Sequence, residues 1–300
     1  MKRKTLLTVL FYIFCFCSCI SGTRKDTRKV LVSEDLKDSI ALQGTVPFEY
    51  DNFKKGEIGI ILDAIVNDTL HLKALFDTGA FGVAMSGVFS KNGNKKDTLT
   101  PFKLQIGRWI YKHPNTDYIN NKLLFDLRGC DLIFGRVFFI DKIIEISFEH
   151  HYIRELENTD DLGSYDKIPF RILNGWLPVI KGKACIKGKT IEGEFIIDTG
   201  YNGTIKVSSS LVKKYKIPTR GDFEFESVGI TKNNKNVRSN VDTIQVGCNY
   251  ITNTIAFLET EKQSLFSVGV GGLIGTYFLD HFSVVLDFKN NYLYLKPIEK

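Results

Sequence analysis

The sequence contains few of the residues that mark non-globular proteins. Only 7 of its 300 residues are proline, and 43% are hydrophobic against 25% charged. This is the composition of an ordinary globular chain, and it excludes a low-complexity tail, a collagen-like repeat and a protein with several membrane spans. Three hundred residues suffice for one large domain or two lobes. The 23 Phe and 12 Tyr residues favour β structure.

A continuous basic stripe is also missing. The formal net charge is +6, but Lys2, Arg3 and Lys4 contribute to it and lie in a segment that we expect to be removed. The other basic residues are scattered and are not interleaved with aromatic residues, as a nucleic-acid-binding surface would require. The sequence therefore predicts no nucleic-acid partner.

Cysteine and histidine are too few and too scattered for a disulfide framework or a metal site. Beyond the N-terminal segment only Cys130, Cys185 and Cys248 remain, an odd number that cannot all pair within the chain. No CxxC motif is present, and the five His residues show no ligand spacing. His150 and His151 instead read as a turn between two strands. We expect neither a metal nor a cofactor.

The N-terminus is typical of an export signal. In residues 1–18 a basic start precedes an apolar run and then small residues, a pattern too short for a comfortable membrane span. The run from Phe16 to Cys19 resembles a bacterial lipobox, with Phe16 where that motif prefers Leu. We expect Cys19 to carry lipid and residues 19–44 to form a tether; simple cleavage, an uncleaved anchor or a short pro-segment are the alternatives. The protein is then an exported lipoprotein of the bacterial cell envelope, bound to a membrane through its N-terminal lipid.

An internal repeat organises the rest of the chain. Residues 131–155 align with residues 271–295 without gaps, so that Gly135 corresponds to Gly275. Upstream, the sequence Phe-Asp-Thr-Gly-Ala corresponds to Ile-Asp-Thr-Gly-Tyr, and each follows a Pro-Phe pair by about 30 residues. The repeat predicts a duplication, with an N-terminal lobe at 45–157 and a C-terminal lobe at 165–300.

Apolar alternation predicts the same local structure in both halves. Hairpins of strands lead into each Asp-Thr-Gly motif, and after Gly135 and Gly275 comes a short helical patch followed by another hairpin. The protein should therefore be almost entirely β. The predicted strands before the motifs are 59–65, 69–76, 176–186 and 190–197, with turns at 67–68 and 187–188.

Two Asp-Thr-Gly loops suggest a specific chemistry. Asp77 and Asp198 each end an apolar strand, where a lone buried carboxylate would be costly. If the halves pack about a pseudo-twofold axis, the two carboxyls meet and share a proton, so that one acts as a base and the other as an acid. Such a pair can activate water for attack on a peptide carbonyl without a metal or cofactor. The hydroxyls of Thr78 and Thr199 are placed to reach across to the opposite loop.

These motifs resemble those of the retropepsin and pepsin superfamily of aspartic proteases. Each half is similar to one retroviral-type subunit, with Asp-Thr-Gly followed by a hydrophobic-hydrophobic-Gly element, and the similarity spans residues 45–298. The resemblance implies a mostly β, bilobal pepsin-like fold of two duplicated, closed β-barrel-like halves. It also implies residue roles: catalysis by Asp77 and Asp198, bracing by Thr78 and Thr199, turn formation by Gly79 and Gly200, and a structural role near the site for Gly135 and Gly275.

The chain departs from the family pattern in two places. The family usually has Ser or Thr after the motif glycine, whereas this chain has Ala80 and Tyr201. Phe81 and Tyr201 either line a substrate pocket or fill the core, and we favour the core. The family also covers its substrate with a hairpin flap; the candidate here, residues 221–241, belongs to the second half. The alternative for this stretch is a surface loop without function.

The sequence thus predicts an aspartic endopeptidase that acts on extended peptide or protein substrates. We expect a monomer, because one chain already supplies both motifs. The alternative function is a non-catalytic peptide- or glycan-binding lipoprotein on the same scaffold.

Overall fold

The computed structural model describes residues 44–50, 59–89, 103–112, 114, 116–220, 222–227, 234–261 and 269–298. The predicted signal segment, the lipidation site Cys19 and nearly all of the predicted tether lie outside these ranges. No helix within them is both long and apolar enough to cross a membrane.

The described chain is mostly β, as predicted. Its strands are β1 (Val46–Tyr50), β2 (Ile60–Val66), β3 (Leu70–Asp77), β4 (Val83–Ser86), β5 (Lys103–Ile106), β6 (Trp109–Lys112), β7 (Thr116–Ile119), β8 (Leu132–Gly135), β9 (Ile143–Ser147), β10 (Tyr152–Leu156), β11 (Asp166–Pro169), β12 (Arg171–Leu173), β13 (Leu177–Ile186), β14 (Lys189–Asp198), β15 (Ile205–Val207), β16 (Phe223–Ser227), β17 (Asn234–Val246), β18 (Asn249–Glu259), β19 (Gly272–Gly275), β20 (Phe282–Asp287) and β21 (Tyr292–Pro297). The helices are α2 (Lys122–Arg128), α3 (Ser209–Lys214) and α4 (Thr276–Leu279), with 3-10 helices η1 (Gly87–Phe89), η3 (Arg136–Phe139) and η4 (Asp160–Leu162).

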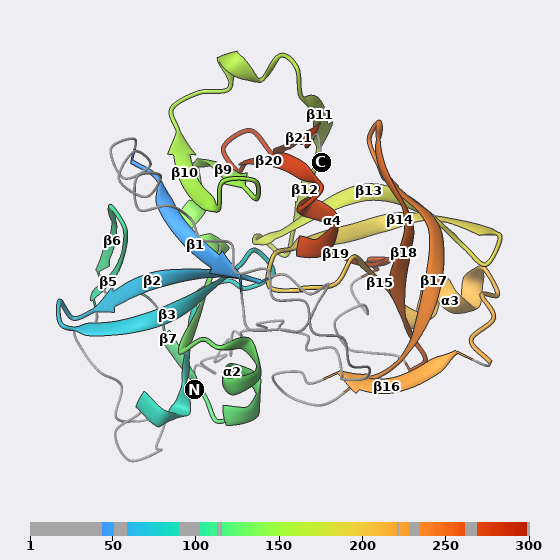
Figure 1. Cartoon of the computed structure of the whole chain (residues 1–300), viewed down its shortest axis with the longest axis horizontal. Helices are drawn as coiled ribbons and strands as arrows, with labels where there is room; N and C mark the ends of the chain where they lie inside the picture. The colour runs from blue at the N-terminus through green and yellow to red at the C-terminus, as the bar shows by residue number, and fades with distance from the viewer. Residues whose placement is uncertain are drawn as a thin grey trace, which may run out of the picture.

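The strands form two sheets. One has 13 strands, in which β11-β21-β20-β9-β10-β1-β2-β3-β8-β4-β7 follow one another and β5 and β6 branch from β2; the other has 8, in the order β12-β13-β14-β19-β15-β18-β17-β16. Figure 1 shows β1, β2 and β3 on one side of the molecule, β13 to β18 on the other, and β9, β10, β20 and β21 above and between them. The two Asp-Thr-Gly motifs therefore come from different sheets.

The hairpins before the motifs form as the sequence predicts. Strand β2 pairs antiparallel with β3, and β13 with β14. The turn residues Asn67 and Asp68 have φ of 50° and 65°, and Lys187 and Gly188 have φ of 50° and 69°. Positive φ at both central residues matches the right-handed twist of the flanking strands. The predicted strand ends differ from the observed ones by about one residue, within the usual uncertainty of element boundaries.

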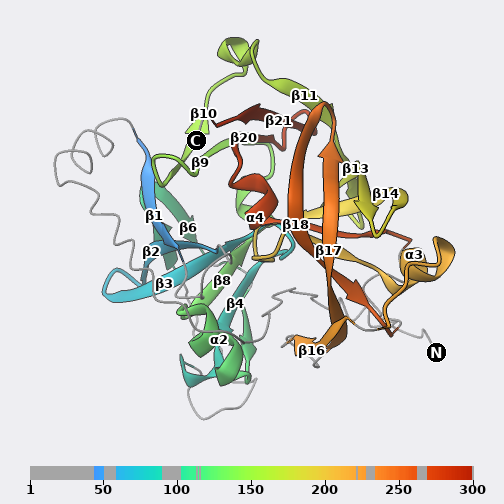
Figure 2. The same cartoon turned by 45° about the vertical axis from the view of Figure 1, so that its right-hand side comes forward.

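The hairpins that follow the two glycines join the halves of the chain. Strand β9 pairs antiparallel with β20, so that Ile144 lies opposite Leu286 and Ile146 opposite Val284. The predicted His150–His151 turn links β9 to β10. In Figure 2 these hairpins again lie together above the other strands. The interior sides of both sheets pack into one large apolar cluster that includes Phe76, Phe134, Phe195 and Ile197.

Candidate active site

Each motif aspartate stands at the end of a central strand. Asp77 ends β3, which runs parallel to β8 with Asp77 opposite Gly135. Asp198 ends β14, which runs parallel to β19 with Asp198 opposite Gly275. The two apolar strands of each pair thus deliver one aspartate and one glycine to the same point.

The two predicted structural glycines lie where no side chain would fit. A Cβ on Gly135 would stand 2.4 Å from the carbonyl oxygen of Ala80, and one on Gly275 would stand 2.2 Å from that of Tyr201. The residues after them hold the loops in place: the amide of Arg136 donates to the Ala80 carbonyl at 2.9 Å, and that of Thr276 to the Tyr201 carbonyl at 2.9 Å. The predicted contact of these glycines with the Asp-Thr-Gly loops is observed.

The motif threonines connect the two loops. The Thr78 hydroxyl donates to the Ile197 carbonyl at 2.7 Å and accepts from the Thr199 amide at 3.1 Å. The Thr199 hydroxyl donates to the Phe76 carbonyl at 2.9 Å and accepts from the Thr78 amide at 3.0 Å. Both side chains are fully buried. Four reciprocal hydrogen bonds therefore lock one loop against the other, as the sequence predicted.

The carboxyls are held by equivalent backbone contacts. Oδ1 of Asp77 accepts hydrogen bonds from the amides of Gly79 at 2.8 Å and Ala80 at 3.0 Å. Oδ1 of Asp198 accepts from the amides of Gly200 at 2.9 Å and Tyr201 at 3.0 Å. In each carboxyl these bonds occupy one oxygen and fix the orientation of the group.

Each carboxyl also lies against the glycine of the opposite loop. A Cβ on Gly79 would stand 2.8 Å from Cγ of Asp198, and a Cβ on Gly200 would stand 2.3 Å from Cγ of Asp77. Both aspartates have 0% exposure, and their side chains are close enough for a hydrogen bond between them. The structure therefore brings the two sequence-predicted residues together, with glycine required on both sides.

The buried pair holds protons more tightly than ordinary aspartates. Burial raises the pKa of Asp77 well above its usual range, and the negative charge of Asp198 raises it further. Burial also raises the pKa of Asp198, while hydrogen bonds from Asp77 and from the loop amides partly offset this rise. Since two adjacent carboxyls titrate as a unit, one proton is retained by the pair at a pH where isolated aspartates have lost theirs.

Three charged residues near the pair were not found from the sequence. The guanidinium of Arg128, at the end of α2, donates from Nη2 to the Gly200 carbonyl at 2.8 Å. On the other side, Lys206 and Glu259 form an ion pair at 3.2 Å with side chains 1% and 0% exposed, and the Lys206 ammonium interacts electrostatically with Asp198. Burial lowers the pKa of Lys206 to about 8. The only sequence signal is a lysine between two apolar strand residues.

The two aromatic residues after the motifs have different environments. Tyr201 is 1% exposed and packs with Ile196 and Leu273 in an apolar cluster, so it belongs to the core as predicted. Phe81 is half-buried, with its ring edge-on to Trp176 at a centroid distance of 6.3 Å.

The candidate flap forms a β-hairpin. Strand β16 pairs antiparallel with β17 from Phe223 opposite Arg238 to Ser227 opposite Asn234; its turn, residues 228–233, lies outside the described ranges. The Phe225 ring contacts Phe257 at 4.8 Å, and Phe257 contacts Tyr201 at 6.3 Å.

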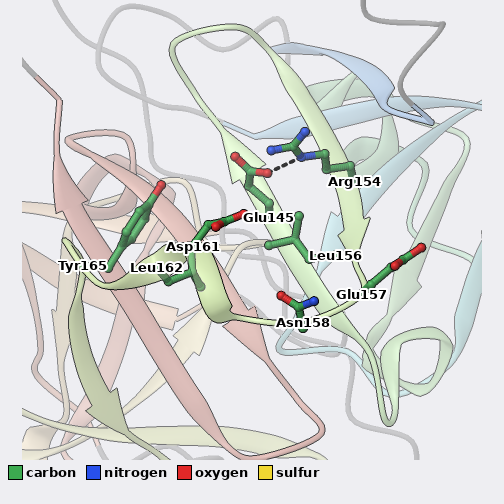
Figure 3. Close-up of a pocket in the computed structure, with 8 residues that line it drawn as sticks. All are labelled: Glu145, Arg154, Leu156, Glu157, Asn158, Asp161, Leu162 and Tyr165. Atoms are coloured by element: carbon green, nitrogen blue, oxygen red, sulfur yellow. Dashed lines mark hydrogen bonds and ion pairs between the residues drawn. The ribbon is translucent and has the colours of Figure 1, made fainter.

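A polar cavity of about 360 Å³ lies apart from these residues. Figure 3 shows that β9, β10 and the η4 turn supply its walls, with Glu145 and Arg154 paired to each other. None of its lining residues contacts an Asp-Thr-Gly loop through a bond described above. Among the residues that the structure describes, no group of His, Cys, Asp and Glu side chains is arranged to hold a metal ion. Cys130, Cys185 and Cys248 are free thiols.

The fold matches that of a known class of protein. The crystal structure of an aspartic proteinase from Irpex lacteus is similar with a TM-score of 0.50 at 14% sequence identity, covering 85% of this chain and 97% of that one. At this identity the similarity concerns the fold alone. It confirms a mostly β, pepsin-like fold; retropepsin-like halves and a lipoprotein stay predictions. No family model matches the sequence, and no curated protein matches it.

Proposed function

We propose that this protein is an aspartic endopeptidase that hydrolyses peptide bonds with a water molecule activated between Asp77 and Asp198. The observation that carries the proposal is the meeting of two buried carboxyls, each against the glycine of the other's loop. Burial and mutual repulsion raise their pKa values, so the pair shares a proton at acidic to mildly acidic pH. A chain with only a binding role has no need for two carboxyls held in this way.

The proposed reaction uses the two carboxyls in opposite roles. The ionised carboxyl takes a proton from water as the water oxygen bonds to the peptide carbonyl carbon, while the protonated carboxyl donates its proton to the carbonyl oxygen. The resulting diol collapses when a proton passes to the peptide nitrogen and the carbon–nitrogen bond breaks. The bonds of Thr78 and Thr199 keep both carboxyls oriented through these steps.

We also propose that the chain is bilobal, with halves at about 45–157 and 165–300 that arose by duplication. The sequence repeat makes Ile144 the counterpart of Val284 and Ile146 the counterpart of Leu286; in the β9–β20 pairing each lies opposite the counterpart of the other. A pseudo-twofold axis between the strands would produce this register, because a twofold contact is self-complementary. The reciprocal threonine bonds have the same symmetry.

The proposed substrate is an extended peptide bound as an added strand across the two halves. We assign the flap to the β16–β17 hairpin of the second half, because aromatic contacts from Phe225 through Phe257 connect it to Tyr201 beside Asp198. Export, lipidation at Cys19 and a monomeric state are proposed from the sequence alone.

Cleavage of a diverse peptide mixture by residues 20–300, followed by mass spectrometry from pH 3 to 8, tests the proposal. We expect Asp77→Asn and Asp198→Asn each to abolish cleavage. Asp63→Asn is the matched control, since its side chain is 82% exposed. Cleavage that survives either active-site substitution would refute the proposed pair. Peptides retained intact by folded wild-type protein would instead support the binding alternative.

A further inference from the structure

Arg128 is the buried charged residue that links helix α2 to the second Asp-Thr-Gly loop. We propose that Arg128 is a positioning residue for the carboxyl pair: its guanidinium holds the loop at Gly200 and places a fixed positive charge beside both aspartates. This inference rests on the proposed function, because it assigns a role in the same site.

Helix α2 directs Arg128 toward the site. The Asn121 side chain accepts from the Leu124 amide at the start of the helix, and Gly129, with φ of 61°, ends it immediately after Arg128. Residues three and four apart lie on one face of a helix, so Arg128 shares a face with Leu124 and Phe125. Those two side chains pack with Ala80, the residue after the first motif. The same face therefore contacts the first loop through apolar groups and the second through the guanidinium.

The hydrogen bond connects all parts of the site. Arg128 has 0% exposure, and its Nη2 donates at 2.8 Å to the carbonyl of Gly200, a residue 72 positions away. Gly200 in turn lies directly against the carboxyl of Asp77. A hydrogen bond from a charged donor in a buried place is among the stronger ones in proteins. A shift of the guanidinium would therefore move the wall against which Asp77 rests.

The charge of Arg128 acts on both carboxyls. It lowers the pKa of Asp77 and that of Asp198, against the larger effect of burial. The other charged groups around the pair are Lys206 and Glu259, which are paired with each other. The family-type Ser or Thr after each motif glycine is replaced here by Ala80 and Tyr201. Arg128 supplies polar support that these two side chains do not give to the carboxyls.

The test is the pH profile of kcat/KM for Arg128→Gln on a peptide that the wild type cleaves. Loss of the positive charge disfavours the ionised carboxyls, so both limbs of the profile should move to higher pH, by about one unit. Arg128→Lys keeps the charge and should keep the limbs in place, with a lower kcat from the lost planar contact. Arg108→Gln is the control, since the Arg108 side chain is 51% exposed. A reduced rate with unmoved limbs in Arg128→Gln would overturn the proposal.

Two measurements separate this inference from the proposed protease activity. Carbon-13 NMR of labelled aspartate carboxyls follows the pair directly, and Arg128→Gln should raise both titrations by about one pH unit even if no peptide is cleaved. In the wild type, the Nε–H resonance of Arg128 should move with the titration of the pair, and Asp77→Asn should remove one step. This second measurement applies even if Arg128→Gln does not fold. An Arg128 resonance unchanged from pH 3 to 8 would refute the inference.

Discussion

The threonine contact between the loops should dominate the stability of the site. Thr78→Val preserves the shape of the side chain but removes the hydroxyl, which donates to the Ile197 carbonyl and accepts from the Thr199 amide. Both partners lie in the buried centre of the molecule, where an unsatisfied polar group costs about 1–3 kcal/mol. The free energy of unfolding should therefore fall by about 2–6 kcal/mol.

Thr78→Ser is the matched control for this substitution. It keeps both hydrogen bonds and removes one methyl group, at a cost of about 1 kcal/mol. Urea unfolding, followed by the fluorescence of Trp109 and Trp176, measures both variants. Because the two hydroxyls belong to one network, Thr78→Val and Thr199→Val should not be additive in the double variant. A Val variant no less stable than the Ser variant would refute this account of the contact.

Three further predictions concern the groups around the pair. Gly200→Ala should abolish cleavage and reduce stability, because the new Cβ would stand 2.3 Å from Cγ of Asp77; a normal kcat would contradict this. The raised pKa of Asp198 means that the folded state holds its proton more tightly than the unfolded state, so stability should fall as pH rises from 3.8 toward neutrality. Asp198→Asn should flatten this fall in urea titrations at several pH values, and an equally steep fall would contradict the assignment. Lys206→Met leaves Glu259 buried without its cation and should cost about 3–5 kcal/mol, whereas adding Glu259→Leu should restore most of the loss in thermal unfolding. A single variant as stable as the double would count against the ion pair.

The sequence carried the strands and the aspartate pair because both depend on local pattern and on the repeat. Alternating apolar residues and turn residues at 67–68 and 187–188 define the hairpins without knowledge of the rest of the chain. The equivalence of Asp77 and Asp198 then follows from the duplication, since equivalent loops in symmetric halves meet at the axis.

The charges around the pair could not be predicted, because they depend on tertiary packing. Arg128 contacts a carbonyl 72 residues away, and no local pattern links the two. Lys206 lies in a short strand between Ile205 and Val207, where alternation places its side chain on the opposite face. Whether that face is buried depends on β18, which contributes Glu259. Helix α2 was also missed, since its seven residues are too few for a clear helical period.

The surrounding charges make the two carboxyls unequal although their backbone contacts are equivalent. Lys206 interacts electrostatically with Asp198, and a nearby cation favours the ionised form. We therefore expect Asp198 to ionise first and Asp77 to keep the shared proton, which makes Asp77 the group that protonates the substrate oxygen. Glu259 holds the ammonium in place at 3.2 Å, so the inequality is built into the second half.

Single variants measure this inequality without the coupling between the carboxyls. In Asp77→Asn the remaining Asp198 titrates alone, and in Asp198→Asn the remaining Asp77 does. Carbon-13 NMR should give the lower pKa for Asp198, and replacing Lys206 and Glu259 together by Met and Leu should narrow the difference. Equal values in the two single variants would mean that Lys206 does not act on the pair, and that the proton is shared without preference as the symmetric backbone alone would dictate.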